Sequence, residues 1–254
     1  MLINSAEYEA MYRTESELWW YRILHLKVLR SISSHFPSNK NIEILDAGCG
    51  TGGMLQSLKN EGYHNIKGFD FSVDAVRLCK TRGLDVEQFS LLEKEEATKQ
   101  YDVVICNDVL YQFDNAEMLQ AFQNLSSKVK KGGVLISNNQ AFEAFRGTHD
   151  IAVGSKRRFV IKDFRNFLTK HGLQLSIQTY NYWSLLLSPL IFGVRLIQRI
   201  QLRLGMIDLK NVKSDVGLPP NFINQFFFRL VKFEDRFLPK HLFGSSLFIT
   251  FNKD

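Results

Sequence analysis

The chain has 254 residues, 45% of them hydrophobic and 23% charged, with a net charge of +6 and three cysteines. This composition fits one soluble, well-buried globular domain with an appendage, and it excludes repeat and low-complexity proteins. The cysteine spacing fits neither a disulfide framework nor a metal cluster, and the first residues lack an apolar signal core, so we expect a cytoplasmic protein.

Short apolar runs alternate with helical patterns over the first 140 residues. Helices are predicted over 5–36, from Met54 to just before Gly62, over 73–80 and over 115–130. Strands are predicted over 42–45, 66–69, 84–89, 102–106 and 134–137, with a turn over 131–133. This alternation predicts a parallel sheet with helices on both faces.

The pattern changes in the second half of the chain. A polar loop over 140–158 precedes a predicted helix over 162–170 and a strand over 173–180. Helices over 184–206 and 221–237 then precede a last strand over 246–251. Because no linker marks a second independent domain, we interpret residues 181–243 as a helical insertion before the last strand.

A glycine-rich turn follows the first predicted strand. The segment ILDAGCGTGG over 44–53 fits the dinucleotide pattern G-x-G-x-x-G at Gly48, Gly50 and Gly53, so the glycines alone are ambiguous. Asp46, two residues earlier, would repel a pyrophosphate. S-adenosylmethionine carries an ammonium and a sulfonium instead, and both favour a nearby carboxylate. The turn therefore favours S-adenosylmethionine over a dinucleotide.

A second acidic residue ends the next predicted strand. Asp70 lies 22 residues after Gly48, where doubly wound nucleotide sites place an acid that accepts hydrogen bonds from the ribose. Phe71 beside it can pack on the adenine face. The alternative is an acidic cap for the following helix, together with Ser72 and Asp74.

Over about residues 40–140, the chain resembles class I S-adenosylmethionine-dependent methyltransferases. The segments that match their successive motifs are, in this order, DAGCGTG, GFDFS, YDVVICNDVLYQF and VKKGGVLIS. The resemblance implies a doubly wound, Rossmann-like α/β fold. Its seven-stranded sheet ends in an antiparallel strand, which SLFITF would supply. One domain then spans 1–254: an N-terminal helical segment over 1–38, a cofactor-binding core over 39–140, and a substrate side over 141–254.

The same resemblance implies a set of cofactor-binding residues. The methionine end lies against Asp46 and the glycine loop, and the ribose binds Asp70. Many relatives place an aspartate against the adenine amine, where this chain has Gln88, Phe89 and Ser90, so that contact falls to backbone or to Ser90. The full predicted set is Asp46, Gly48, Cys49, Gly50, Gly52, Asp70, Phe71, Ser90, Asn107 and Asp108.

The residues after the fourth predicted strand bear on the chemistry. Relatives that methylate adenine or amide nitrogens usually carry Asn/Asp-Pro-Pro-Tyr/Phe here, whereas this chain has Asn107-Asp108-Val-Leu, which disfavours that chemistry. Our leading expectation is an oxygen acceptor. A hydroxyl acceptor needs a base, and His149, with Asp150 beside it, is the predicted one. Tyr111 is the second candidate. The alternatives are an exposed loop histidine and a packing tyrosine.

The chain also resembles, more loosely, a bacterial methyltransferase group associated with surface-glycan and lipid-linked pathways. The segments that carry this resemblance are WWYR, HD with GSKRRF, TYNYWSLLLSPL, and LPP near the end. This resemblance implies a small or lipid- or sugar-linked acceptor. Ser155 stands where relatives often have histidine. Arg157 and Arg158 are predicted to clamp an anionic group of the substrate, the alternative being a solvated turn.

Charge is distributed unevenly along the chain. Residues 1–140 carry 15 Lys/Arg and 18 Asp/Glu, whereas residues 141–254 carry 17 and 8. In the insertion, Arg195, Arg199 and Arg203 recur every four residues beside an aliphatic stripe. Three interpretations stay open: core or homodimer packing, a lid over an apolar substrate, and peripheral contact with an anionic membrane. The uncharged run over 182–194 is too short to span a bilayer.

The leading hypothesis is therefore methyl transfer from S-adenosylmethionine to a small-molecule or lipid-linked acceptor. An RNA methyltransferase is an alternative, motivated by a pI near 9.2. No RNA-binding module is recognisable, so we do not expect a nucleic-acid partner. The other alternative is a catalytically silent subunit that keeps the fold for binding.

Overall fold

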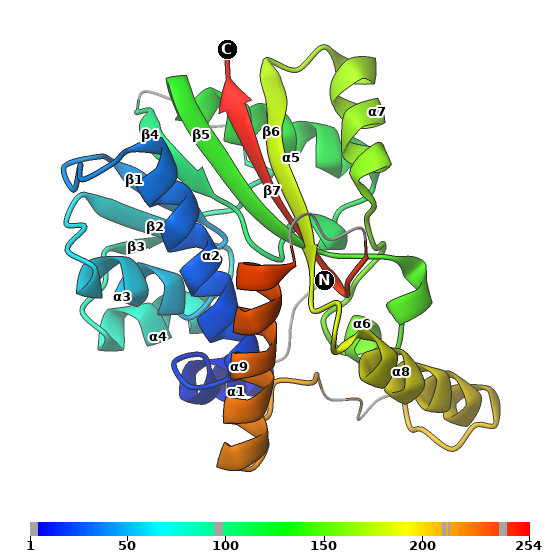
Figure 1. Ribbon diagram of the computed structural model, residues 1–254. Helices are drawn as coiled ribbons and strands as arrows, with labels where there is room; N and C mark the ends of the chain where they lie inside the picture. The colour runs from blue at the N-terminus through cyan, green and yellow to red at the C-terminus, as the bar shows by residue number, and fades with distance from the viewer. Residues whose placement is uncertain (1–4, 94–98, 210–211, 213, 239–242) are drawn as a thin grey trace.

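The structure is a computed structural model that describes residues 5–93, 99–209, 212, 214–238 and 243–254. Its centre is a seven-stranded sheet in the order β3-β2-β1-β4-β5-β7-β6, with β7 antiparallel to both neighbours (Figure 1). The prediction of a doubly wound sheet with an antiparallel last strand is confirmed. The strands are β1 Ile44–Ala47, β2 Ile66–Asp70, β3 Val86–Gln88, β4 Tyr101–Ile105, β5 Val129–Gln140, β6 Leu175–Trp183 and β7 Ser246–Lys253.

Helices cover both faces of the sheet because its central strands are apolar on both sides. Along β4, Val103 and Ile105 pack in one core and Val104 in the other. The first core includes α2, α3 and α4, and the second includes α5 and α7. The helices are α1 Ser5–Thr14, α2 Trp19–His35, α3 Gly53–Asn60, α4 Val73–Thr81, α5 Asn115–Lys128, α6 Thr148–Ala152, α7 Ile161–His171, α8 Ser188–Arg203 and α9 Asn221–Phe237.

The structure corrects four predicted elements. The helix over 5–36 is two helices, separated over 15–18. The turn predicted over 131–133 is wrong, because β5 already begins at Val129. Lys131 and Gly132 are exposed residues of this strand and lie where its register against β4 shifts. The loop over 140–158 contains α6. Residues 181–183 complete β6, so the insertion begins after Trp183.

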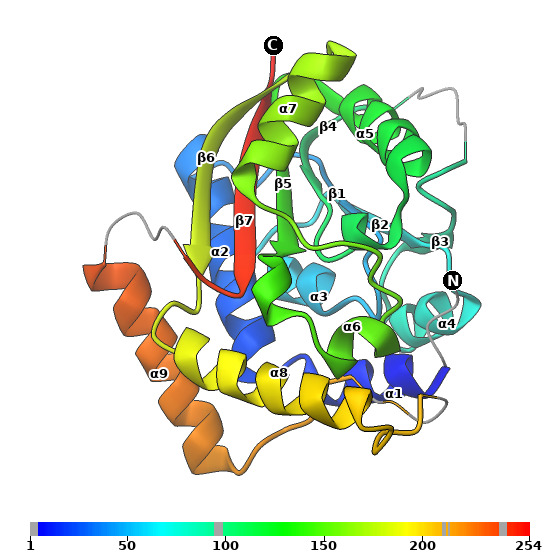
Figure 2. The same cartoon turned by 90° about the vertical axis from the view of Figure 1, so that its right-hand side faces the viewer.

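The helices outside the central layers gather at one end of the molecule. Figure 2 shows α1, α6 and α8 lying together beyond the edge to which β5 points, with α9 beside α8. Within the described ranges, no helix is long and apolar enough to cross a bilayer.

Candidate functional site

A cavity of about 460 Å³ opens at the carboxyl ends of β1, β2 and β4. Doubly wound proteins bind ligands at this edge. The cavity wall includes most of the predicted site residues, namely Asp46, Gly48, Cys49, Gly50, Asp70, Phe71, Asn107, Asp108, Tyr111, His149 and Arg158. Gly52, Ser90 and Arg157 do not lie on it.

The glycine loop brings backbone close to this cavity. Gly48 and Gly50 both have positive φ, at 78° and 55°, a conformation that side chains disfavour. A Cβ on Gly48 would also lie 2.5 Å from Val109 Cγ2. Gly52 serves a different purpose, because its missing side chain makes room for Leu84, 2.5 Å from an ideal Cβ. Gly52 therefore shapes the start of α3 and stays off the wall.

Two carboxyl groups from neighbouring parallel strands face the cavity. Asp46 is buried, and within the described part of the chain no side chain or backbone group donates a hydrogen bond to it. Burial, then Asp70 and Glu15 nearby, raises the pKa of Asp46 to about 8. Asp70 accepts hydrogen bonds from the Gly50 and Ser72 amides, both at 2.9 Å. Burial also raises the pKa of Asp70.

Asp70 does not cap α4, the helix that follows it, and its carboxyl group remains available to a ligand. Ser72 caps α4 by accepting from the Ala75 amide, so Asp70 is not itself the N-cap. Each Asp70 oxygen accepts one backbone hydrogen bond and keeps lone-pair capacity for a ligand hydroxyl. Phe71 is 36% exposed on the rim, where a flat ligand can stack. Ser90 instead accepts from the Leu92 amide in a local turn.

Glu15, which sequence reasoning missed, braces the glycine loop. It stands between α1 and α2, is buried, and accepts from Thr51 Oγ1 at 2.5 Å and from the Gly53 amide at 3.1 Å. Arg82 forms an ion pair with it. The Gly53 amide belongs to the first turn of α3, whose donors have no partner within the helix. The carboxylate thus stabilises the N-terminus of α3 and fixes the loop that precedes it.

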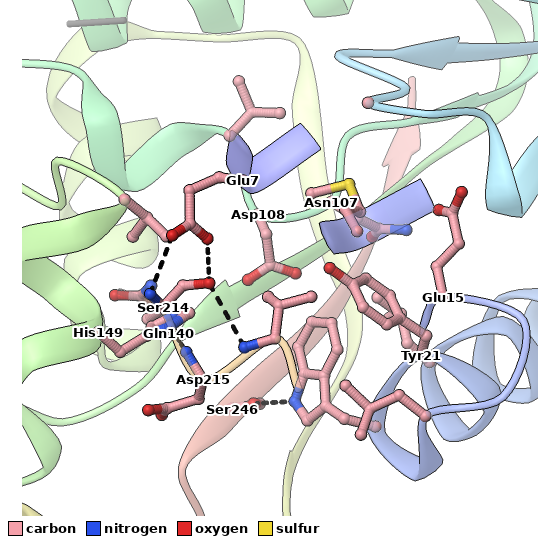
Figure 3. Close-up of a pocket in the computed structure, with 18 of the residues that line it drawn as sticks. Glu7, Glu15, Tyr21, Asn107, Asp108, Gln140, His149, Ser214, Asp215 and Ser246 are labelled. Atoms are coloured by element: carbon pink, nitrogen blue, oxygen red, sulfur yellow. Dashed lines mark hydrogen bonds between the residues drawn. The ribbon is translucent and has the colours of Figure 1, made fainter. Parts of the chain in front are cut away.

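Asp108 occupies the centre of the wall, and Figure 3 shows its carboxylate pointing into the pocket between Ser214 and Tyr21. Its φ of 56° is unusual for a residue other than glycine. Asn138 Nδ2 donates to it at 2.8 Å, and Trp183 Nε1 donates to Asn138 Oδ1 at 2.9 Å, which fixes the orientation of the Asn138 amide. Burial raises the pKa of Asp108 to about 7, with the Asn138 hydrogen bond opposing it.

Aromatic side chains form the rest of the central wall. Tyr111 is buried in the second core and also lines the cavity, so it packs and faces a ligand at once. Tyr21 faces Asp108, and burial raises the pKa of both phenols. Trp20 stacks on Trp183 at 5.6 Å and hydrogen-bonds Ser246. Tyr21 and Trp20 come from α2, whose Trp19, Trp20 and Tyr21 the sequence showed only as an aromatic patch.

His149 lies on α6 and lines the cavity, with its acceptor nitrogen already engaged. The Asp215 amide lies 3.2 Å from Nδ1, so Nδ1 accepts and the neutral ring carries its proton on Nε2. Burial lowers the pKa of His149, which keeps it neutral. The base predicted from sequence can accept a proton only after the Asp215 amide moves away. His25, on α2, is a second histidine of the wall, and burial lowers its pKa to about 4.

Residues 214–217 form a strap across the pocket. The Ser214 amide donates to Glu7 of α1 at 3.2 Å, and the Ser214 hydroxyl donates to the same carboxylate. Asp215 forms an ion pair with Arg195 of α8. Arg195 is therefore buried, whereas Arg203 at the other end of the predicted stripe is exposed. The strap joins α1, α6 and α8 over the cavity (Figure 3).

The predicted clamp of Arg157 and Arg158 does not form. Arg158 is buried and gives its Nε and Nη2 to Asp150, at 2.7 and 3.0 Å, and its Nη1 to the Ala141 carbonyl. Arg157 hydrogen-bonds Asn115, away from the cavity. The two guanidinium groups point to different partners. Arg158 already makes its bidentate interaction with Asp150, so it does not offer this geometry to a ligand.

Sequence comparisons relate the chain to known methyltransferases. A family model described as methyltransferase domain matches residues 21–182. A ubiquinone biosynthesis O-methyltransferase of Rickettsia bellii (strain OSU 85-389) is 30% identical over 151 residues, covering 53% of this chain and 61% of that protein. A malonyl-[acyl-carrier protein] O-methyltransferase of Bacillus anthracis is 29% identical over 129 residues, covering 48% and 46%. The chain thus spans about half to three fifths of these relatives.

Solved structures share the fold over most of the chain. An S-adenosylmethionine-dependent methyltransferase from Clostridium acetobutylicum ATCC 824 superposes with a TM-score of 0.52 at 13% identity, covering 89% of this chain and 88% of that one. The [4+2]-cyclase SpnF superposes with a TM-score of 0.54 at 15% identity, covering 89% and 80%. A methyltransferase and a cyclase share this architecture, so the activity has to be argued from the site.

Proposed function

This chain belongs to the methyltransferase-domain family, and we propose that it transfers a methyl group from S-adenosylmethionine to an oxygen of a small or lipid- or sugar-linked acceptor. The observation that carries the proposal is the gathering of carboxyl groups on the cavity wall, which a cationic ligand would hold in their ionised form. Asp46, Asp70 and Asp108 face the cavity together, and aspartates hold its two arginines in ion pairs. Such a wall favours a cationic ligand and opposes a pyrophosphate.

The residues present fit S-adenosylmethionine. Asp46 offers a buried carboxylate without a hydrogen-bond donor among the described residues, and it suits the ammonium or the sulfonium. The positive-φ backbone at Gly48 and Gly50 permits close approach of the methionine end. Asp70 would hold the ribose and Phe71 the adenine. When bound, the cofactor supplies an electrophilic methyl group on sulfur.

The acceptor end of the cavity favours an apolar group with a polar tip. Its wall combines Trp19, Trp20, Tyr21 and Phe145 with the side chain of Gln140. Aromatic walls bind rings and chains by apolar burial, and a few polar groups set the orientation. The two curated relatives, by their descriptions, are O-methyltransferases, which supports an oxygen acceptor.

We propose Asp108 as the proton acceptor. Its carboxylate is oriented by Asn138, points into the pocket, and has a pKa of about 7, which suits a base at neutral pH. Asp108 would accept the hydroxyl proton of the acceptor as the acceptor oxygen takes the methyl group, and the cofactor would leave as the neutral thioether. His149, the base predicted from sequence, remains the alternative after the strap opens.

Calorimetry tests cofactor binding. S-adenosylmethionine and S-adenosylhomocysteine should bind with micromolar Kd, about −8 kcal/mol. Asp46→Asn removes the facing charge and should weaken S-adenosylmethionine binding about tenfold or more, whereas Asp85→Asn, on the exposed surface, should leave it unchanged. Binding of NADH without binding of S-adenosylmethionine contradicts the proposal.

A methyl-transfer assay tests the base and the acceptor class. With labelled S-adenosylmethionine and a panel of phenols, sugars, carboxylic acids and bulk RNA, we expect transfer to a hydroxyl compound and none to RNA. Asp108→Asn should lower turnover about a hundredfold, and the wild-type rate should fall as pH drops below about 7. His149→Gln should keep that pH profile. Loss of turnover in His149→Gln with normal turnover in Asp108→Asn would return the role to His149.

A further inference from the structure

On α8 and α9, many apolar side chains face solvent while several polar and charged side chains are buried. On α8 the buried residues are Ser188 and Arg195, whereas Ile197 is 57% exposed. On α9, Asn224 and Glu234 are buried together with Val231, whereas Phe222 is 77% exposed. We call the exposed apolar residues of these helices and the α8 C-cap the apolar face: Leu190, Phe192, Val194, Leu196, Ile197, Ile200, Leu204, Phe222, Phe226, Phe233 and Phe237. A helix facing water shows the opposite arrangement.

Exposed charge on the same two helices has one sign. Each exposed charged residue of α8 and α9 is a cation, and these residues are Arg203, Arg229, Lys232 and Arg236. The two acids of α9 turn inward. Glu234 is buried and accepts from the Leu186 amide at 2.9 Å, and Asp235 pairs with Lys27 of α2. The apolar face is therefore flanked by positive charge that no acid of these helices offsets at the surface.

The apolar face lies at the end of the molecule that holds the pocket. On the inner side of α8, Ile191 and Arg195 line the cavity. On the inner side of α9, Phe227 packs edge-on against Trp19, which is also part of the cavity wall, at 5.8 Å. Figure 2 shows both helices beyond the same sheet edge. One helix layer thus separates the cavity from whatever covers the apolar face.

We propose that the apolar face docks on the surface of an anionic lipid bilayer. Aliphatic and phenylalanine side chains enter the boundary between headgroups and acyl chains, and the flanking cations contact the anionic headgroups. The alternative occupant is a second copy of the chain. A two-fold contact through this face would place four cations of one copy against four of the other, which opposes pairing. Charge complementarity therefore favours lipid.

This inference rests on the proposed function in one respect: docking would present the pocket to an acceptor that has an acyl or prenyl part. Flotation with vesicles tests docking alone. Wild-type protein should float with vesicles of phosphatidylglycerol and phosphatidylcholine, and much less with phosphatidylcholine only or at high salt. Changing Arg203, Arg229, Lys232 and Arg236 to Gln should weaken partition roughly tenfold or more. Ile197→Ser with Ile200→Ser should do the same on anionic vesicles.

The matched control changes four exposed lysines elsewhere, Lys59, Lys80, Lys162 and Lys170, to Gln. This variant carries the same charge loss and should still float. Calorimetry with S-adenosylhomocysteine reports on the fold and the cofactor site of every variant, so failure of docking and failure of the proposed function remain distinguishable. Absence of flotation, equal loss in the control, or a dimer that Ile197→Ser with Ile200→Ser dissociates without any vesicle binding would overturn the proposal. So would RNA binding, lost in the α8–α9 charge variant, without vesicle binding.

Discussion

Asp46 holds a proton in the folded chain that it releases in the unfolded chain. Its pKa is about 8 when buried, against an ordinary value of 3.8. Between these two pH values the folded state binds more protons, so the free energy of unfolding falls as pH rises from about 4 to 8. The same carboxylate that suits a cationic ligand therefore destabilises the ligand-free protein at neutral pH and above.

Asp46→Asn isolates this effect. The amide has nearly the same shape and no charge, so the variant should match the wild-type stability near pH 4, below which both states of the wild type bind the proton. At pH 8.5 it should be more stable by a few kcal/mol, on the order of 1.4 kcal/mol per unit of pKa shift. Urea unfolding at both pH values measures the difference. Asp85→Asn on the exposed surface is the control, and an equal difference for Asp46→Asn at both pH values would contradict this account of its burial.

Sequence reasoning at single residues succeeded where the motif itself sets the backbone position. Asp46 and Asp70 end adjacent parallel strands, so the chain order alone places both at one sheet edge. It failed where a side chain has several partners within reach. Arg158 is a residue type that is common in anion-binding sites. Here Asp150, eight residues earlier, accepts hydrogen bonds from two nitrogens of its guanidinium group. The sequence shows both residues and does not show their pairing.

Among the elements, apolar runs predicted the buried strands closely because β4 and the second half of β5 are covered on both faces. The errors fall at exposed or functional segments. The turn expected at 131–133 lies within β5, where the strand shifts register against β4: Tyr101 pairs with Val129 and Val103 pairs with Val134. The break between α1 and α2 has no proline or glycine to announce it. It follows from tertiary contacts of Glu15 with Thr51 and Gly53, which sequence periodicity cannot report.

The strap is likewise invisible to pattern analysis. Residues 214–217 have neither helical nor strand periodicity, and they matter because three separate elements hold them. Glu7, His149 and Arg195 belong to α1, α6 and α8, and each contacts Ser214 or Asp215. Convergence of that kind depends on the complete fold. The sequence indicated an insertion near the substrate and left its role as core, lid or membrane contact open.

At the scale of the whole molecule, segments from the two halves of the chain meet over the cavity. The acidic first 140 residues provide the carboxyl groups that face the proposed cofactor, and the basic remainder provides the strap and the apolar face. The proposed cofactor-binding and lipid-docking surfaces thus lie in different parts of one chain. The connection between them is the contact of α1 with the strap, where Glu7 holds Ser214.

This connection predicts that cofactor binding orders segments far apart in sequence. Met11 of α1 lies over the glycine loop, with its sulfur 3.1 Å from an ideal Cβ on Gly50, so a ligand on that loop restrains α1. Hydrogen exchange with saturating S-adenosylhomocysteine should therefore slow in α1 and in 214–217, roughly tenfold, and stay unchanged in α7. In Glu7→Gln the weaker contact with Ser214 should preserve the protection of α1 and reduce that of the strap. Equal protection of the strap in both proteins would show that Glu7 does not transmit the effect and that the ligand reaches the strap directly.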